Sequence, residues 1–247
     1  MNFQDLNIAI FGAYGGIGKV LANSLKSKNV NLFLCGRNSE KIQTLAQELE
    51  SPFQVCDASD FSSTEEAINN CVATYGRLDG VVNCCGSLLL KPAHISSEAD
   101  FNNVINCSLK TSFSICKNAS RAMMEHGGSV VFISSAAANI GLPNHEGIAA
   151  AKAAVQGLAI SAAASYASKR IRFNVVAPGL VETPLTSNIT KNPSALNASI
   201  SMHPLGKIGQ PSDIVSAIEF FLSRDNSWIT GQILAVDGGL SSMKSRP

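Results

Sequence analysis

Residues 6–28 read LNIAIFGAYGGIGKVLANSLKSK, and this stretch decides the fold. Its first six residues form a short apolar run, and the next seven contain four glycines. The residues that follow place apolar side chains at helical spacing. The pattern therefore predicts a strand, a glycine-rich turn and a helix.

The same alternation of strand and helix patterns continues along the chain. Further strands are expected at residues 30–35, 53–56, 78–84, 130–134, 171–178 and 231–236. Helices are expected to begin at Asn38 or Ser39 and at Ser62 or Ser63, and to span residues 98–124, 147–158 and 211–222. Continuous apolar strands separated by helices are typical of a parallel sheet that is covered on both faces. We expect an α/β fold with a seven-stranded, mostly parallel sheet in one doubly wound Rossmann-type domain over residues 1–247.

One long polar connection, residues 183–207, interrupts this alternation. A segment of that length in a compact domain is usually a lid or a binding loop, so a substrate lid is predicted. The alternative is a mobile excursion that contains a short helix.

Composition excludes several kinds of partner. The chain has 247 residues, 45% apolar and 15% charged, with a formal net charge of +1. It has no block of basic residues that would attract nucleic acid or an anionic membrane. We see no run near the roughly 18 apolar residues that a membrane span needs, and no signal-peptide pattern in MNFQDLN. A cytoplasmic protein with a small-molecule substrate is expected.

The seven cysteines show no CxxC pair and no metal-ligand spacing with histidine. Several lie in apolar strand-like runs, where cysteine behaves as a small hydrophobic residue. We therefore expect reduced thiols in the core and no metal site.

The glycine-rich turn points to a dinucleotide. Gly12, Gly15, Gly16 and Gly18 lie between the first strand and the first helix, where backbone N–H groups can approach a pyrophosphate. Their spacing is not GxGxxG, and glycine also serves tight turns and close helix packing. The position directly after the first strand favours the dinucleotide interpretation.

The glycine-rich turn and several other motifs of the sequence resemble those of the short-chain dehydrogenase/reductase family. The family pattern GxxxGxG is met by Gly12, Gly16 and Gly18. Asp57 is similar to the family's adenine-contacting aspartate, residues 83–86 (NCCG) to its NxxG motif, residues 178–183 to its PGxxxT nicotinamide segment, and residues 237–239 to its DGG. Together these patterns predict cofactor contacts from Gly12, Tyr14, Gly15, Gly16, Ile17, Gly18, Arg37, Asn38, Asp57, Ala58, Asn83, Gly86, Lys152, Pro178, Gly179, Val181 and Thr183.

The end of the second strand bears on the choice of cofactor. An acidic residue there would accept hydrogen bonds from a ribose 2′-OH, but the chain has Gly36 followed by Arg37. An arginine is suited to a 2′-phosphate, so NADP(H) is the expected cofactor. The alternative is that Arg37 is an ordinary surface arginine.

The catalytic pattern of the family is only partly present. The resemblance implies that Ser135 and Lys152 match the family's serine and lysine, whereas Ile148 stands where its tyrosine is expected and Ser108 where its asparagine is expected. His145, one helical turn before Ile148, is a candidate proton donor. A water held by Ser135 and Lys152 is an equal candidate.

Two functions therefore remain open from the sequence. One is an NADP(H)-dependent oxidoreductase with a non-standard proton donor. The other is a catalytically silent NADP-binding subunit, either a sensor or the silent partner of an active relative. The resemblance gives Lys152 an additional role in binding the nicotinamide ribose. It also implies that the small residues of 149–168 pack in a homo-oligomer, a tetramer or dimer. His203 is expected to be an exposed loop residue, and the alternative is that it reaches a substrate through the lid.

Overall fold

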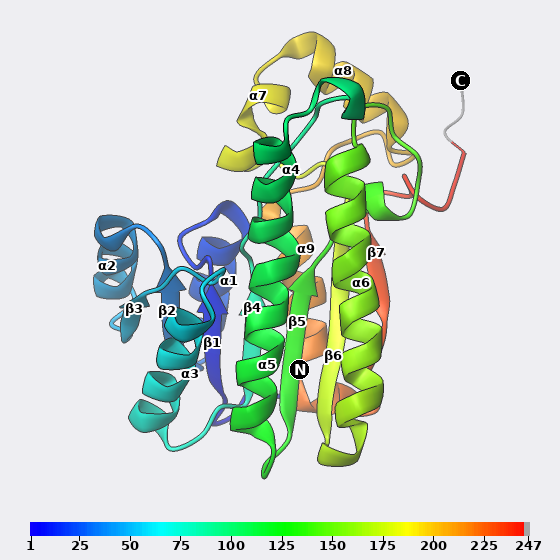
Figure 1. Ribbon diagram of the computed structural model, residues 1–247. Helices are drawn as coiled ribbons and strands as arrows, with labels where there is room; N and C mark the ends of the chain where they lie inside the picture. Colours follow the sequence, from blue (N-terminus) through cyan, green and yellow to red (C-terminus); the bar gives the residue numbers. More distant parts are fainter. Residues whose placement is uncertain (245–247) are drawn as a thin grey trace.

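The computed structural model describes residues 1–244 and contains one seven-stranded sheet. The strands are β1 (Asn7–Phe11), β2 (Asn31–Gly36), β3 (Phe53–Val55), β4 (Gly80–Asn83), β5 (Gly128–Ile133), β6 (Ile171–Pro178) and β7 (Ile233–Val236). They lie in the order β3-β2-β1-β4-β5-β6-β7, and every pairing between them is parallel (Figure 1). This confirms the expected single doubly wound Rossmann-type domain.

Helices cover both faces of the sheet (Figure 1). They are α1 (Gly16–Lys26), α2 (Ser39–Glu48), α3 (Phe61–Tyr75), α4 (Glu98–Ile105), α5 (Thr111–Met123), α6 (Glu146–Tyr166), α7 (Ser187–Thr190), α8 (Pro193–Met202) and α9 (Pro211–Leu222). One apolar core joins the sheet to α1, α2 and α9, and a second joins its other face to α3, α5 and α6. Burial on both faces explains why the strands read as continuous apolar runs.

Capping side chains set the beginnings of two helices. Asn38 caps α2, as expected, and its side chain accepts a hydrogen bond from the Lys41 N–H. Helix α3 begins at Phe61, before the expected Ser62 or Ser63. The reason is Asp60, whose carboxylate accepts hydrogen bonds from two N–H groups in the first turn of the helix.

The helix expected over residues 98–124 is present, but its middle is π-helical. A π-helical segment, Asn106–Lys110, separates α4 from α5. Here the hydroxyls of Thr111 and Ser112 donate to the Ser108 carbonyl at 3.0 and 2.8 Å. Such side-chain bonds compete for carbonyls that an α-helix would use, which explains the local irregularity.

The long alanine-rich helix corrects a second expectation. Glu146–Lys169, which is α6 with the turn that follows it, is long and apolar enough by length and composition to cross a membrane. In the structure its Val155, Ala159 and Ala163 belong to the core against the sheet. The core helix of a sheet protein meets the same length criterion, so this segment is not evidence for a membrane span.

The carboxyl ends of the strands meet at one edge of the sheet. The strand order reverses between β1 and β4, and parallel sheets bind ligands at such a switch point. The segment predicted as a lid contains α7 and α8, which lie beyond this same edge (Figure 1).

Candidate functional site

The turn after β1 requires glycine for reasons of space. Gly12 has a φ of +74°, and a Cβ there would lie 2.9 Å from the backbone of Cys84 at the end of β4. A Cβ on Gly18 would lie 2.3 Å from the Gly12 carbonyl oxygen. The turn therefore packs backbone against backbone, and it opens at the N-terminus of α1, as a pyrophosphate site requires.

Gly16 brings the turn against the segment that follows β6. A Cβ on Gly16 would be 2.7 Å from Cβ of Thr183. Thr183 is held in turn by Thr186, whose hydroxyl donates to the Val181 carbonyl at 2.6 Å. The GxxxGxG and PGxxxT motifs, far apart in the sequence, thus meet in space.

Tyr14 connects the turn to the end of β2. Its hydroxyl accepts a hydrogen bond from the Asn38 N–H at 3.2 Å, and its ring lies where a side chain on Gly36 would be. An acidic side chain therefore has no room at position 36, and the first polar side chain after β2 is that of Arg37.

A cavity of about 170 Å³ lies between the carboxyl ends of β1, β2 and β4. Its walls include the predicted residues Gly12, Tyr14, Gly15, Arg37, Asp57, Ala58 and Gly86. They also include Gly36, Cys84 and Cys85, which belong to motifs already noted but were not predicted as cofactor contacts, and Cys56, Ser59, Cys107 and Thr111, which the sequence did not single out. Only the strand-end position of several of these could have indicated them.

Asp57 presents a carboxylate at this cavity. Partial burial opposes its ionisation, but hydrogen bonds from the Ser59 N–H and hydroxyl, together with the charges of Arg37 and Lys110, lower the pKa of Asp57 overall. A charged acceptor therefore stands beside Arg37 on the cavity wall.

Asn83 supports the cavity from behind. Its amide donates to the hydroxyls of Thr111 and Ser112 at 3.2 and 3.0 Å, and its carbonyl accepts from the Cys85 N–H. Asn83 is buried and does not line the cavity, so its contacts fix the chain after β4.

The remaining predicted cofactor residues lie beside the cavity or at its lid end. Ile17 lies in the first turn of α1, and Val181 is buried and pairs with Gly209. Pro178 ends β6, and Gly179 follows it at a neighbouring cavity of about 320 Å³.

His203 corrects the expectation of an exposed loop residue, because it is buried. Its Nδ1 donates to the Ser199 carbonyl at 2.6 Å, and its Nε2 accepts from the Leu180 N–H at 3.2 Å. The ring therefore ties α8 to the segment after β6, with no nitrogen left for a substrate.

Lys152 is buried in α6, and its Nζ donates to the Ile133 carbonyl at 2.8 Å. A Cβ on Gly86 would lie 3.6 Å from this nitrogen, so the lysine faces the strand ends. Burial lowers the pKa of Lys152 to about 8. Ser134 fixes the helix here, because its hydroxyl donates to the Lys152 carbonyl at 2.9 Å and accepts from Gln156.

The other catalytic candidates differ in their surroundings. The Ser135 hydroxyl accepts from the Ala137 N–H at 3.2 Å and retains its own proton for donation. His145 precedes α6, and its Nδ1 donates to the Pro143 carbonyl at 2.7 Å. Ile148 is buried in a small apolar cluster with Val104 and Ala151. The buried Ser108 hydroxyl has no partner within residues 1–244.

The structure gives no support to a metal centre. Within the described residues no group of three or more His, Cys, Asp or Glu side chains could hold an ion. All seven cysteines are free; four of them are buried, and Cys84, Cys85 and Cys107 are half-buried at the cavity.

A parallel sheet whose switch point carries a glycine turn at a helix N-terminus defines the class of Rossmann-type dinucleotide-binding proteins. The enoyl-(acyl carrier protein) reductase family model matches residues 12–241. Carbonyl reductase family member 4 of Danio rerio is 34% identical over 94% of this chain and 96% of its own length.

Two solved structures extend this likeness. A short-chain type dehydrogenase/reductase from Mycobacterium ulcerans superposes with a TM-score of 0.95 at 29% identity, over 99% of this chain and 93% of that one. ElxO with NADP bound superposes with a TM-score of 0.91 at 32% identity, over 97% and 100%. The chain belongs to the short-chain dehydrogenase/reductase family of oxidoreductases.

Proposed function

We propose that the protein is an NADP(H)-dependent oxidoreductase that transfers hydride between the nicotinamide and a small carbonyl or alcohol substrate. The observation that carries this proposal is the glycine-lined cavity with Arg37 at its wall. Its support from relatives is that one is named a carbonyl reductase and another was solved with NADP bound.

The cofactor fits the residues present. The turn at Gly12, Gly16 and Gly18 has no room for a Cβ at any of the three, which leaves backbone N–H groups for a pyrophosphate. Arg37 would pair with the 2′-phosphate, and Asp57 would accept from the adenine. The bound nicotinamide supplies the hydride chemistry.

The proton that accompanies hydride transfer needs a donor other than residue 148. A neutral His145 already gives its one N–H to Pro143, so it donates to a substrate only as an imidazolium. Lys152, with a pKa of about 8, carries a proton at neutral pH. We therefore assign proton delivery to Lys152 through a water that the Ser135 hydroxyl also holds.

The experiment is a carbonyl panel with NADPH or NADH, followed by loss of absorbance, together with dissociation constants for both cofactors. NADPH should bind more tightly, and Arg37→Gln should remove that preference while Arg121→Gln, which changes an arginine on α5, should not. Turnover should be lost in Lys152→Met. Equal affinity for the two cofactors would contradict the cofactor assignment, and unchanged turnover in Lys152→Met would contradict the site.

Ile148 favours a second candidate, a cofactor-binding subunit without catalytic activity of its own. Its side chain packs with Val104 and Ala151 and offers no proton, and the buried hydroxyl of Ser108 has no partner within residues 1–244. Tight NADPH binding without turnover on any carbonyl, together with a stoichiometric second dehydrogenase-like chain on purification from the native cell, would favour this candidate over the first.

We also propose a homo-oligomer, a tetramer or dimer, in the cytoplasm. Phe113 of α5 and Ile160 of α6 are half exposed, which supports a covered helix face. Seven free cysteines support a reducing compartment. Light scattering that gives only a 25.9 kDa species would contradict the oligomer.

A further inference from the structure

A second cavity, of about 650 Å³, lies at the opposite edge of the sheet from the proposed cofactor site. Its walls include Leu6, Asp79, Gly128 and Ile171, which lie at or just before the amino ends of β1, β4, β5 and β6. Ligands of Rossmann-type sheets bind at the carboxyl ends, roughly a strand length away, about 17–20 Å. The proposed function therefore leaves this cavity unexplained.

The cavity is strongly cationic. Arg77, Arg170, Arg172 and Arg224 line it, with His126 beside them. Asp79 is the one acidic side chain among the described residues of the wall. Four guanidinium groups against one carboxylate leave several positive charges without a counter-charge.

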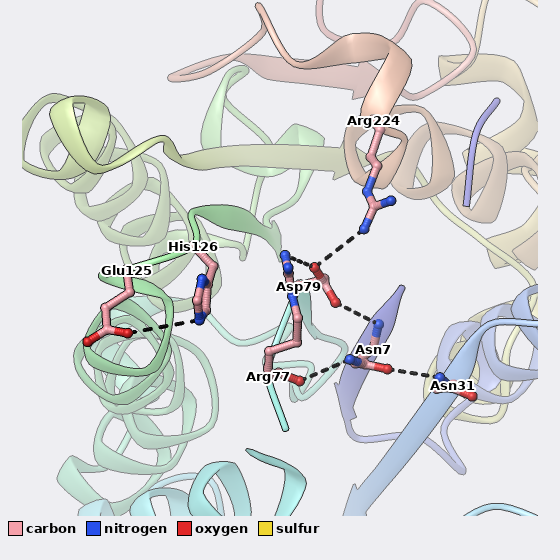
Figure 2. Close-up of polar contacts among 7 residues, drawn as sticks. All are labelled: Asn7, Asn31, Arg77, Asp79, Glu125, His126 and Arg224. Atoms are coloured by element: carbon pink, nitrogen blue, oxygen red, sulfur yellow. Dashed lines mark hydrogen bonds and ion pairs between the residues drawn. The ribbon is translucent and has the colours of Figure 1, made fainter. Parts of the chain in front are cut away.

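The carboxylate of Asp79 already has partners within the protein. Asp79 is buried, pairs with Arg77, accepts from the Asn7 N–H at 3.1 Å, and lies 3.7 Å from Arg224, as Figure 2 shows. Arg77 nevertheless has a buried Nε with no hydrogen-bond partner within residues 1–244. A buried donor without a partner is costly, and the Arg77 side chain is otherwise 42% exposed at the wall of the cavity.

Two further arginines have different roles. Arg172 donates to the carbonyls of Ile229 and Phe221 at 2.8 and 2.6 Å, which fixes the wall. Arg170 is exposed and has a φ of +59°, a conformation that a non-glycine residue rarely adopts. Gly127 permits it, because a Cβ there would be 2.7 Å from the Arg170 carbonyl oxygen. This conformation ends the turn Ala167–Lys169, and the Arg170 side chain that follows the turn lines the cavity.

An aromatic side chain completes the cavity. Trp228 lines it and is 99% exposed, although it is the chain's one tryptophan. Apolar side chains of Leu6 and Leu222 lie on the same wall. An exposed indole beside arginines offers a flat surface for a ring whose charged group the arginines hold.

We propose that this cavity binds an organic phosphate that carries an aromatic ring. A phosphate monoester has up to two negative charges and three acceptor oxygens, which suits several arginines better than a single carboxylate does. Arg77, Arg170 and Arg224 take the phosphate, and Trp228 covers the ring. The site is independent of the proposed NADP(H) site.

The test is a titration of the full chain with phenyl phosphate at low ionic strength, followed by tryptophan fluorescence. Because Trp228 is the one tryptophan, the signal reports this cavity directly. A saturable change is expected. Arg170→Gln and Arg224→Gln should each weaken binding about tenfold, the loss of one charge-assisted hydrogen bond, whereas Arg121→Gln and Arg37→Gln should leave it unchanged.

Calorimetry with Trp228→Ala separates the ring contact from the phosphate contact. Phenyl phosphate should bind to this variant more weakly than to the wild type, whereas inorganic phosphate should bind equally to both proteins. No saturable change, or the same change with sodium chloride at equal ionic strength, would overturn the proposal. The proposal would also be overturned if the protein bound acidic peptides but not phenyl phosphate. It would be overturned as well if Arg170→Gln bound phenyl phosphate with the same affinity as the wild type. NADPH binding by the same variants is measured in parallel, so failure here is distinguishable from failure of the proposed function.

Discussion

The ring of Tyr14 fills the space that a side chain on Gly36 would need: a Cβ at residue 36 would lie 2.4 Å from Tyr14 Cε1. This one relationship joins the glycine turn to the strand end that selects the cofactor. It also explains why the position where an acidic residue would favour NAD carries no side chain.

Gly36→Ala should therefore destabilise the protein by about 1–3 kcal/mol, the usual cost of overpacking a filled space. Urea unfolding measures the loss. Tyr14→Ala should remove most of the penalty when the two changes are combined, and Gly141→Ala, where a Cβ meets nothing within 4 Å, is the matched control. A Gly36→Ala variant as stable as the control would contradict this packing.

Ile148→Tyr should raise carbonyl reduction with NADPH, because the new hydroxyl places an acid where the family has one. A positioned general acid contributes about 10²- to 10⁴-fold in rate. Ile148→Phe is the control, since it adds a ring without the hydroxyl. Equal rates in the two variants would show that the hydroxyl does not reach the reacting oxygen.

Activity should fall as the pH rises past about 8, because burial lowers the pKa of Lys152 to about 8 and its charged form is the protonated one. The ammonium is present below that value and is lost above it. A pH profile of kcat/KM measures the decline. Lys152→Arg, which stays protonated to about pH 12, should show no decline between pH 7 and 9. A decline that persists in this variant would assign it to another group.

Stability should fall above about pH 9, the ordinary value for these thiols, because burial raises the pKa of Cys71 and Cys85 to about 12 and that of Cys35 above its usual range. Between these values the unfolded thiols lose protons that the folded ones keep, so folding weakens with rising pH. Between about pH 8 and 10.5, Lys152 has the opposite effect on stability, because its pKa is lower in the folded protein than in the unfolded chain. It is one group against several thiols.

Chemical denaturation from pH 8 to 11 measures this slope, at up to about 1.4 kcal/mol per pH unit for each thiol. Cys71→Ala should make the slope shallower, although the smaller side chain lowers stability at every pH. An unchanged slope in that variant would contradict the assignment.

His203→Ala should loosen the lid, because it removes the bonds to Ser199 and Leu180 and leaves the Leu180 N–H without an acceptor. Faster hydrogen exchange over α8 is expected, with a higher KM for substrate. His94→Ala, at an exposed position, is the control. Exchange that does not change in α8 would mean that other contacts hold the segment.

The sequence alone determined the order of strands and helices and the position of the glycine turn. Apolar runs such as residues 6–11 and the four glycines that follow are local signals, because strand burial and backbone approach act on neighbouring residues. The motifs also indicated Arg37, Asp57 and Lys152, whose residue types carry their chemistry with them.

Only the tertiary structure decided which of these groups meet. Thr183 contacts Gly16, His203 is buried against Leu180, and the arginines around Asp79 converge from separate segments of the chain. Such contacts depend on how parallel strands align and helices pack, and no periodicity records them. The sequence named the chemical groups of the cofactor site, and long-range packing set their surroundings and formed the second cavity.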